Sequence, residues 1–263
     1  MGTSDTKEET RLKLFSASAL PKALPVRHSF APMKARPLAF ALSFLAAAAF
    51  APAADNQLTA AEKSAGWQLL FDGQTMKGWR TYAGKPAGGW EVLEGTLHAI
   101  AKVKGSELIT EKKFKDFEFA WEWKVPVAGN NGVKYFVTEA RTKSPGHEYQ
   151  MLDDDGHPDG KIGPHRQTAS FYDVLPPAAD KPSRKPGEWN QSRIVVKGNT
   201  VEHWLNGKNV LTYVLGSPEV KAGLAKSKFA KEPGFGDKIE GHIMLTYHQD
   251  NCWYRNIKIR ELK

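Results

Sequence analysis

The chain is poor in cysteine and in cofactor motifs. Its 263 residues contain one cysteine, Cys252, so no disulfide can form within the chain. No internal repeat, zinc-ligand spacing, phosphate-binding Gly–Lys loop or dinucleotide fingerprint is present. These absences exclude a disulfide scaffold and leave no basis for predicting a zinc or nucleotide cofactor.

Long apolar runs are also lacking. The longest, residues 38–50 (LAFALSFLAAAAF), is too short to span a membrane comfortably, so we predict no membrane span. It follows a basic stretch that starts at Met33 and precedes small residues at 51–54, which is typical of a secretory signal peptide. We therefore expect a signal peptide at residues 33–54, translation from Met33, and a periplasmic or secreted protein. Residues 1–32 are then an upstream extension of the reading frame, the alternative being a disordered leader.

The excess of basic residues is small once this segment is set aside. The formal net charge is +8, but seven of the 37 basic and three of the 29 acidic residues lie in residues 1–54, which leaves +4. A balance this close to neutral gives no reason to predict nucleic-acid binding.

Helical periodicity is scarce, whereas short strand patterns bounded by glycine-containing turns are frequent. Residues 117–125 alternate aromatic and charged side chains, and Asn206-Gly207 is a strong hairpin signal. One short helix is expected within residues 218–229. The pattern predicts a single all-β domain, a sandwich or jelly roll, at residues 66–263 after a short linker at 55–65. The strands are expected at residues 67–71, 90–93, 96–100, 117–125, 133–138, 193–197, 200–205, 210–214, 242–247 and 252–260.

Ionisable residues gather at residues 146–173, which hold three histidines and six acidic residues in 28 positions. Glu148 and Gln150 are two apart in a predicted strand and share a face, and Asp153 follows at the strand end. Two carboxyl groups at one place can divide acid and base roles, so we predict catalysis by Glu148 and Asp153. The alternative is a solvated outer strand.

The acidic loop after this strand is a possible cation site. Asp153, Asp155 and Asp159 could supply oxygen ligands to Ca²⁺ or another divalent cation, although their spacing does not match the EF-hand and a plain turn is equally compatible. Arg166 could stabilise an oxyanion or simply neutralise the loop. Trp121 and Trp123 could stack on sugar rings or belong to the core.

Several short motifs resemble those of the 3-keto-disaccharide hydrolase family of secreted bacterial proteins. The resemblance covers roughly residues 66–262 in the family's order. One departure, Leu245-Thr246-Tyr247-His248-Gln249 where the family often has Leu-Gln-Asp-His-Gly, indicates a divergent subgroup. The matching segments include Leu70-Phe71-Asp72-Gly73, Trp90-x-Val92-x-x-Gly95, Asn130-Asn131-Gly132-Val133, Glu148-Tyr149-Gln150-x-Leu152-Asp153, His157-Pro158-Asp159, His203-Trp204-Leu205-Asn206-Gly207 and Arg255-Asn256-Ile257.

The resemblance implies a concanavalin-like jelly roll that cleaves glycosides already oxidised at C3. The C2 proton would be removed, the C1 leaving group eliminated, and water added. In this scheme Glu148 or Asp153 is the base or acid and His157 or His165 the alternative proton carrier. Substrate contacts are expected from Lys134, Gln150, Arg166, Tyr172, Trp121, Trp123 and His248. The partner is then a carbohydrate, and we expect a monomer or weak homo-oligomer.

Two other functions fit parts of the sequence. Glu148-x-Gln150-x-x-Asp153 has the spacing of the Glu-x-Asp-x-x-Glu motif of family 16 glycoside hydrolases, which are retaining enzymes, although two of its positions differ. A non-catalytic carbohydrate-binding module is the second alternative, because jelly rolls serve both purposes.

Overall fold

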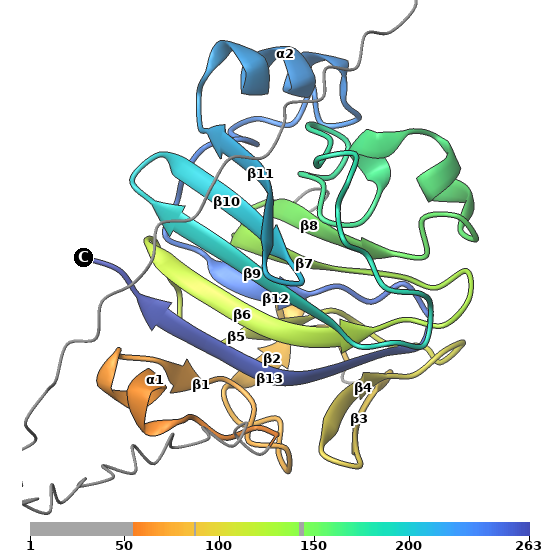
Figure 1. Cartoon of the computed structure of the whole chain (residues 1–263), viewed down its shortest axis with the longest axis vertical. Coiled ribbons are helices and arrows are strands. Elements are labelled where there is room, and N and C mark those ends of the chain that lie inside the picture. Colours follow the sequence, from red (N-terminus) through yellow and green to blue (C-terminus); the bar gives the residue numbers. More distant parts are fainter. Residues whose placement is uncertain (1–54, 87, 142–144) are drawn as a thin grey trace, which may run out of the picture. The chain divides into compact units, whose positions relative to one another are not determined.

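Short strands with alternating burial form almost all of the regular structure in the computed structural model, which describes residues 55–86, 88–141 and 145–263 (Figure 1). The predicted upstream extension and signal peptide, residues 1–54, lie outside the described residues. All described residues belong to one compact unit. Within these ranges no helix is both long and apolar enough to cross a bilayer.

The strands form two antiparallel sheets, as predicted. In the eight-stranded sheet, here sheet A, the spatial order is β11 (Lys208–Val214), β10 (Thr200–Leu205), β9 (Asn190–Lys197), β6 (Phe117–Lys124), β13 (Cys252–Glu261), β4 (Thr96–Ala99) and β3 (Trp90–Leu93), with β1 (Gln68–Leu69) paired to β13. In the five-stranded sheet, here sheet B, it is β2 (Trp79–Thr81), β5 (Leu108–Thr110), β12 (His242–Leu245), β7 (Asn130–Val137) and β8 (His147–Leu152).

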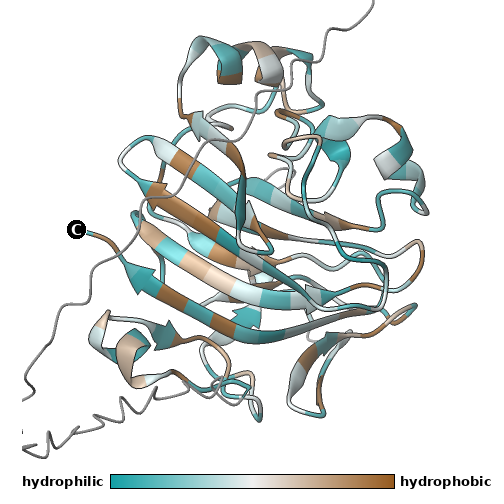
Figure 2. Ribbon diagram, in the orientation of Figure 1, coloured by the Kyte–Doolittle hydropathy of each residue, from teal (hydrophilic) through white to brown (hydrophobic). Residues whose placement is uncertain are grey.

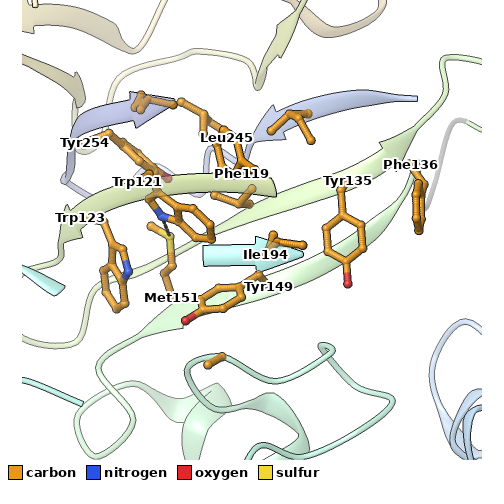
Figure 3. Packing of buried hydrophobic residues seen from close by; sticks show 14 of the residues in the cluster. Phe119, Trp121, Trp123, Tyr135, Phe136, Tyr149, Met151, Ile194, Leu245 and Tyr254 are labelled. Atoms are coloured by element: carbon orange, nitrogen blue, oxygen red, sulfur yellow. Dashed lines mark hydrogen bonds between the residues drawn. The ribbon is translucent and has the colours of Figure 1, made fainter. Parts of the chain in front are cut away.

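The core lies between the two sheets. Hydropathy alternates along β6 and the strands beside it (Figure 2), because successive side chains point to opposite faces of a strand. Trp121 and Trp123 both point inward and are 2% exposed. Figure 3 shows Trp121 beside Met151, whose sulfur accepts a hydrogen bond from the indole N–H, and Trp123 Nε1 donates to Ser192 Oγ. Neither indole therefore offers an open face to a sugar, and the core interpretation replaces the predicted substrate contact.

Turn chemistry and helix capping follow the local sequence. Asn206 and Gly207 both have positive φ, 47° and 83°, and join β10 to β11 as the sequence predicts. Helix α2 (Pro218–Lys226) falls inside the expected helical segment and begins at an N-cap serine. Residues 55–65 are more than a linker, because they contain helix α1 (Ala60–Ser64), whose Thr59 and Glu62 form a capping box.

Strand β8 lies at the edge of sheet B, and its outer edge is covered by the following loop. The loop contains two 3-10 turns, η2 (Pro158–Lys161) and η3 (Pro164–Arg166), and returns along β8. The Tyr172 N–H donates to the Glu148 carbonyl at 3.0 Å, and the Ala169 N–H donates to the Gln150 carbonyl at 2.9 Å. Backbone pairing therefore fixes this loop beside the outward-facing side chains of β8.

Candidate active site

The outer face of sheet B carries a polar cavity of about 260 Å³, close to the lower end of the usual size of ligand pockets. Tyr149 and Met151 of β8 belong to the core, so the alternating Glu148 and Gln150 point the other way. Their neighbours come from β7, from the covering loop, from the segment after α2 and from the segment after β12. The cavity is lined by Asn130, Lys134, Gly146, Glu148, Gln150, Tyr172, Lys228, Phe229 and His248.

Glu148 is the carboxylate of this cavity, and its side chain is only 8% exposed. It lies over Gly132, where an added Cβ would come within 2.4 Å of Glu148 Oε1. Lys134 is its partner on β7 in the strand register, and Lys134 Nζ lies 3.5 Å from Glu148 Oε2. The missing side chain at Gly132 thus makes room for the carboxylate, and Lys134 places a positive charge beside it.

Lys228 and Tyr172 also line the cavity. The Lys228 ammonium donates to Tyr172 Oη at 3.1 Å and lies 4.2 Å from the centre of that ring. Tyr172 Oη in turn donates to Asp159 Oδ2 at 2.7 Å. Burial raises the pKa of Tyr172, and the hydrogen bond to Asp159 raises it further, so the phenol stays protonated. Desolvation lowers the pKa of Lys228, although the charges of Glu148 and Asp173 oppose this effect.

His248 and Asn130 complete the polar lining. His248 is accessible to solvent, yet desolvation by the surrounding walls lowers its pKa below the usual 6.5, with Glu148 opposing the shift. The imidazole is therefore neutral at pH 7. Asn130 Oδ1 is buried and has no hydrogen-bond partner among the described residues, which leaves an acceptor for a ligand hydroxyl.

Asp153, His157 and His165 do not line this cavity. Asp153 accepts from the backbone N–H of Ala128 at 2.7 Å and of Gly156 at 3.1 Å, so both carboxylate oxygens hold the loop. It faces a separate cavity of about 270 Å³ together with Asp154, Asp155 and Lys181, among others. His157 Nδ1 caps the first turn of η2 by accepting from the Asp159 N–H. His165 Nε2 lies 3.6 Å from Asp173 Oδ1.

Arg166 does not line the cavity either, and its guanidinium is bound within the acidic loop. Its Nε donates to Asp173 Oδ1 at 2.6 Å, and its Nη1 donates to Asp159 Oδ1 at 2.8 Å. These two bonds hold the pKa of Arg166 above its usual value, although partial burial works against them. Of the two interpretations drawn from the sequence, the contacts favour neutralisation of the loop.

The three aspartates considered for a cation are not gathered around one point. No group of three or more His, Cys, Asp or Glu in the described ranges is arranged to hold a metal ion. Asp153 is engaged with backbone N–H groups and Asp159 with Arg166 and Tyr172, while Asp155 is exposed. The residues present do not fit an all-protein Ca²⁺ cage, which needs about six oxygen ligands.

The sequence predicts Lys134, Glu148, Gln150, Tyr172 and His248 at the site, and the structure brings all five together. Four further lining residues are not predicted from the sequence: Lys228, Phe229, Asn130 and Gly146. Asn130 belongs to the Asn-Asn-Gly-Val motif and could have been found there. Lys228 follows α2 in a lysine-rich segment, and nothing in the sequence distinguishes it from Lys226 or Lys231.

A buried carboxylate among two lysines, a neutral histidine and a free amide acceptor is a site that can move protons on a small polar ligand. The fold is a β-sandwich, and the cavity on it holds the groups that acid–base chemistry needs. Residues 66–260 match the 3-keto-alpha-glucoside-1,2-lyase-like domain, and the chain belongs to that family.

Known proteins agree with this assignment. A 3-keto-disaccharide hydrolase of Bacteroides thetaiotaomicron is 34% identical over 229 residues, which is 75% of this chain and 79% of that protein. A crystal structure from Parabacteroides distasonis, of a protein assigned to the glycosyl hydrolases, has a TM-score of 0.73 at 32% identity and covers 80% of this chain and 100% of that chain. A second crystal structure from the same organism has a TM-score of 0.62 at 26% identity and covers 74% of this chain and 99% of that chain. The enzyme class predicted from the sequence, one that acts on glycosidic bonds, is confirmed.

Proposed function

We propose that the enzyme cleaves the glycosidic bond of 3-keto-glycosides, 3-keto-disaccharides among them, by elimination and hydration. The observation that carries this proposal is Glu148, the one carboxylate among the described residues that line the cavity, held over Gly132 with a lysine beside it. A ketone at C3 acidifies the C2 proton, so a single well-placed carboxylate suffices as the base.

Glu148 removes the C2 proton, and the electron pair passes into the C3 carbonyl to give an enediolate. Collapse of the enediolate expels the oxygen at C1, and the protonated Glu148 is then an acid near the departing oxygen. Water adds to C1 of the resulting enone, and C2 takes up a proton that derives from this water, which gives the free 3-keto sugar. His248, neutral at pH 7, can accept the proton of that water.

The retaining mechanism of the family 16 type is disfavoured by the position of Asp153. That mechanism needs two carboxyl groups about 5–5.5 Å apart on the sugar. Here Asp153 lines a different cavity from Glu148, and both of its oxygens accept backbone hydrogen bonds. Binding without turnover of any keto-glycoside would instead support the non-catalytic binding module.

The test compares a 3-keto-disaccharide with its unoxidised parent, using wild-type enzyme and Glu148→Gln. We expect cleavage of the keto substrate alone and a fall in kcat of about 10²–10⁴ in the variant, which keeps the shape but cannot take a proton. Cleavage of the parent at a similar rate, or a variant as active as wild type, would refute the assignment.

We also propose that the enzyme is exported, because residues 33–54 have the pattern of a signal peptide. Expressed from Met33 in a Gram-negative host, the protein should be recovered from the periplasm with an N-terminus near residue 54 or 55. Recovery of the uncleaved chain from the cytoplasm would contradict this proposal.

A further inference from the structure

We propose that Lys228 binds the developing enediolate oxygen at C3, and that Arg166 is a positioning residue that holds Lys228 in place from outside the cavity. This inference rests on the proposed function, since an oxyanion arises at C3 only if the substrate carries a 3-keto group. It gives a role to the acidic loop that is structural rather than directly chemical.

The two lysines of the cavity differ in what they contact. Lys134 Nζ is paired with Glu148 at 3.5 Å. Lys228 has no carboxylate within ion-pair distance among the described residues, and its ammonium has one hydrogen bond there, to Tyr172 Oη. An ammonium has three N–H donors, so two remain for a ligand. Lys228 is thus the cation of the cavity that is available for a new negative charge.

A continuous set of contacts connects Lys228 to Arg166. Arg166 binds Asp159 through Nη1 and Asp173 through Nε. Asp159 accepts a hydrogen bond from Tyr172 Oη, and the same hydroxyl oxygen accepts a hydrogen bond from the Lys228 ammonium. Asp173 Oδ2 accepts from the Lys228 backbone N–H at 2.7 Å. One guanidinium therefore orders both the side-chain and the main-chain partners of Lys228.

The surroundings favour a charged lysine that is a stronger acid than usual. The ammonium lies 4.2 Å from the ring centre of Tyr172 and 5.2 Å from that of Phe229, which favours the cation over the free amine. Desolvation lowers its pKa, Lys134 and Arg166 lower it further, and Glu148 and Asp173 raise it. A cation with a reduced pKa is better matched to an enol oxygen, and it can donate without forming a covalent bond.

The first test replaces the ammonium. Lys228→Met should lower kcat on the 3-keto-disaccharide by about 10²–10³, the usual loss for an oxyanion donor, while Lys228→Arg retains part of the activity. Lys226→Met, on the exposed side of α2, is the matched control and should equal wild type. If the wild type does not cleave the keto substrate, the proposed function fails. If it does and Lys228→Met keeps its kcat, the proposed function stands and the role of Lys228 is refuted.

The second test follows the basic limb of the kcat–pH profile. The wild-type kcat should fall at high pH as the Lys228 ammonium loses its proton, with a pKa below the usual lysine pKa of about 10.4. Arginine stays charged over this range, so Lys228→Arg should lack this fall. Arg166→Met removes a cation and frees two carboxylates, both of which raise the pKa of Lys228, so the limb should move to higher pH. If Arg166→Met loses activity only because part of it misfolds, the basic limb of its profile stays at the wild-type pH. An unmoved limb would overturn the positioning role of Arg166.

Two further measurements keep the inference testable if Arg166→Met does not fold. Tyr172→Phe keeps the ring but removes the acceptor of the Lys228 ammonium, and it should lower kcat about 10-fold with KM unchanged. Cyanoborohydride, which reduces an imine in preference to the substrate's ketone, should leave Lys228 unmodified in the mass spectrum when it is added during turnover. A reduced substrate adduct on Lys228 would show an imine in place of the proposed electrostatic contact, and equal kcat in Tyr172→Phe would remove the phenol from the scheme.

Discussion

Replacing Gly132 by alanine should displace the Glu148 carboxylate, the proposed base, without breaking the sheet. Gly132 lies in β7 opposite Gln150, and its φ is outside the left-handed region, so alanine is compatible with the backbone. The added Cβ would lie 2.4 Å from Glu148 Oε1, 3.1 Å from Cγ and 3.2 Å from Cδ. Ordinary contacts to a Cβ start at 3.4 Å, so the carboxylate has to move by about 1 Å.

A displacement of about 1 Å at the reacting group costs on the order of 10²-fold in rate, since proton transfer depends on the position of the base. We expect kcat of Gly132→Ala on a 3-keto-disaccharide to fall by this factor while the melting temperature changes little. Steady-state kinetics and a thermal scan measure both quantities on the same preparation.

A double-mutant cycle provides the control. In the Glu148→Gln background the base is already lost, so adding Gly132→Ala should reduce kcat little further, because the two changes act on one interaction. If Gly132→Ala keeps wild-type kcat, or if its effect adds in full to that of Glu148→Gln, the reasoning from this contact is wrong.

The remaining predictions concern residues that do not line the cavity. Asp153→Asn should lower the free energy of unfolding by about 1–2 kcal/mol through weakened loop hydrogen bonds, with kcat retained; a loss like that of Glu148→Gln would contradict this. Trp123→Phe should lower stability by about 1–3 kcal/mol, because the bond to Ser192 is lost, and leave KM unchanged; a raised KM would restore the sugar-stacking role. Burial lowers the pKa of His147 to about 3 and of His203 to about 4, so the unfolded chain binds protons first as pH falls below 6.5. The free energy of unfolding should therefore fall between pH 6.5 and 4, and His203 should account for about 3 kcal/mol of this fall. Urea titrations at several pH values should show a shallower fall for His203→Gln than for wild type. An equal fall would show that His203 does not contribute to the pH dependence.

Much of the fold could be predicted because strand periodicity and turn chemistry are local. The alternation of residues 117–125 predicts β6 (Phe117–Lys124), and Asn206-Gly207 fixes the β10–β11 hairpin. The pairing order of the sheets has no such local signal. Strand β13, for example, lies between β6 and β4, which precede it by more than 120 residues.

The site could be predicted only where its members share one strand. Glu148 and Gln150 are two apart on β8, and the register then brings in Lys134. Asp153 is one residue beyond the strand, where the chain turns and its carboxylate accepts nearby backbone N–H groups. Lys228 reaches the cavity because its backbone N–H donates to Asp173, which is 55 residues away in the chain. A contact of that kind depends on tertiary structure and leaves no spacing to recognise.

The central claim, that Glu148 removes a C2 proton from a 3-keto-glycoside, is tested most directly by proton NMR in D₂O. The enzyme is incubated with a 3-keto-disaccharide, and deuterium at C2 of the released 3-keto sugar is measured for wild type and for Glu148→Gln. We expect deuterium at C2 in the wild-type product and a large loss of both exchange and cleavage in the variant. Cleavage that leaves the C2 proton in place would contradict the elimination mechanism and return the choice to direct hydrolysis.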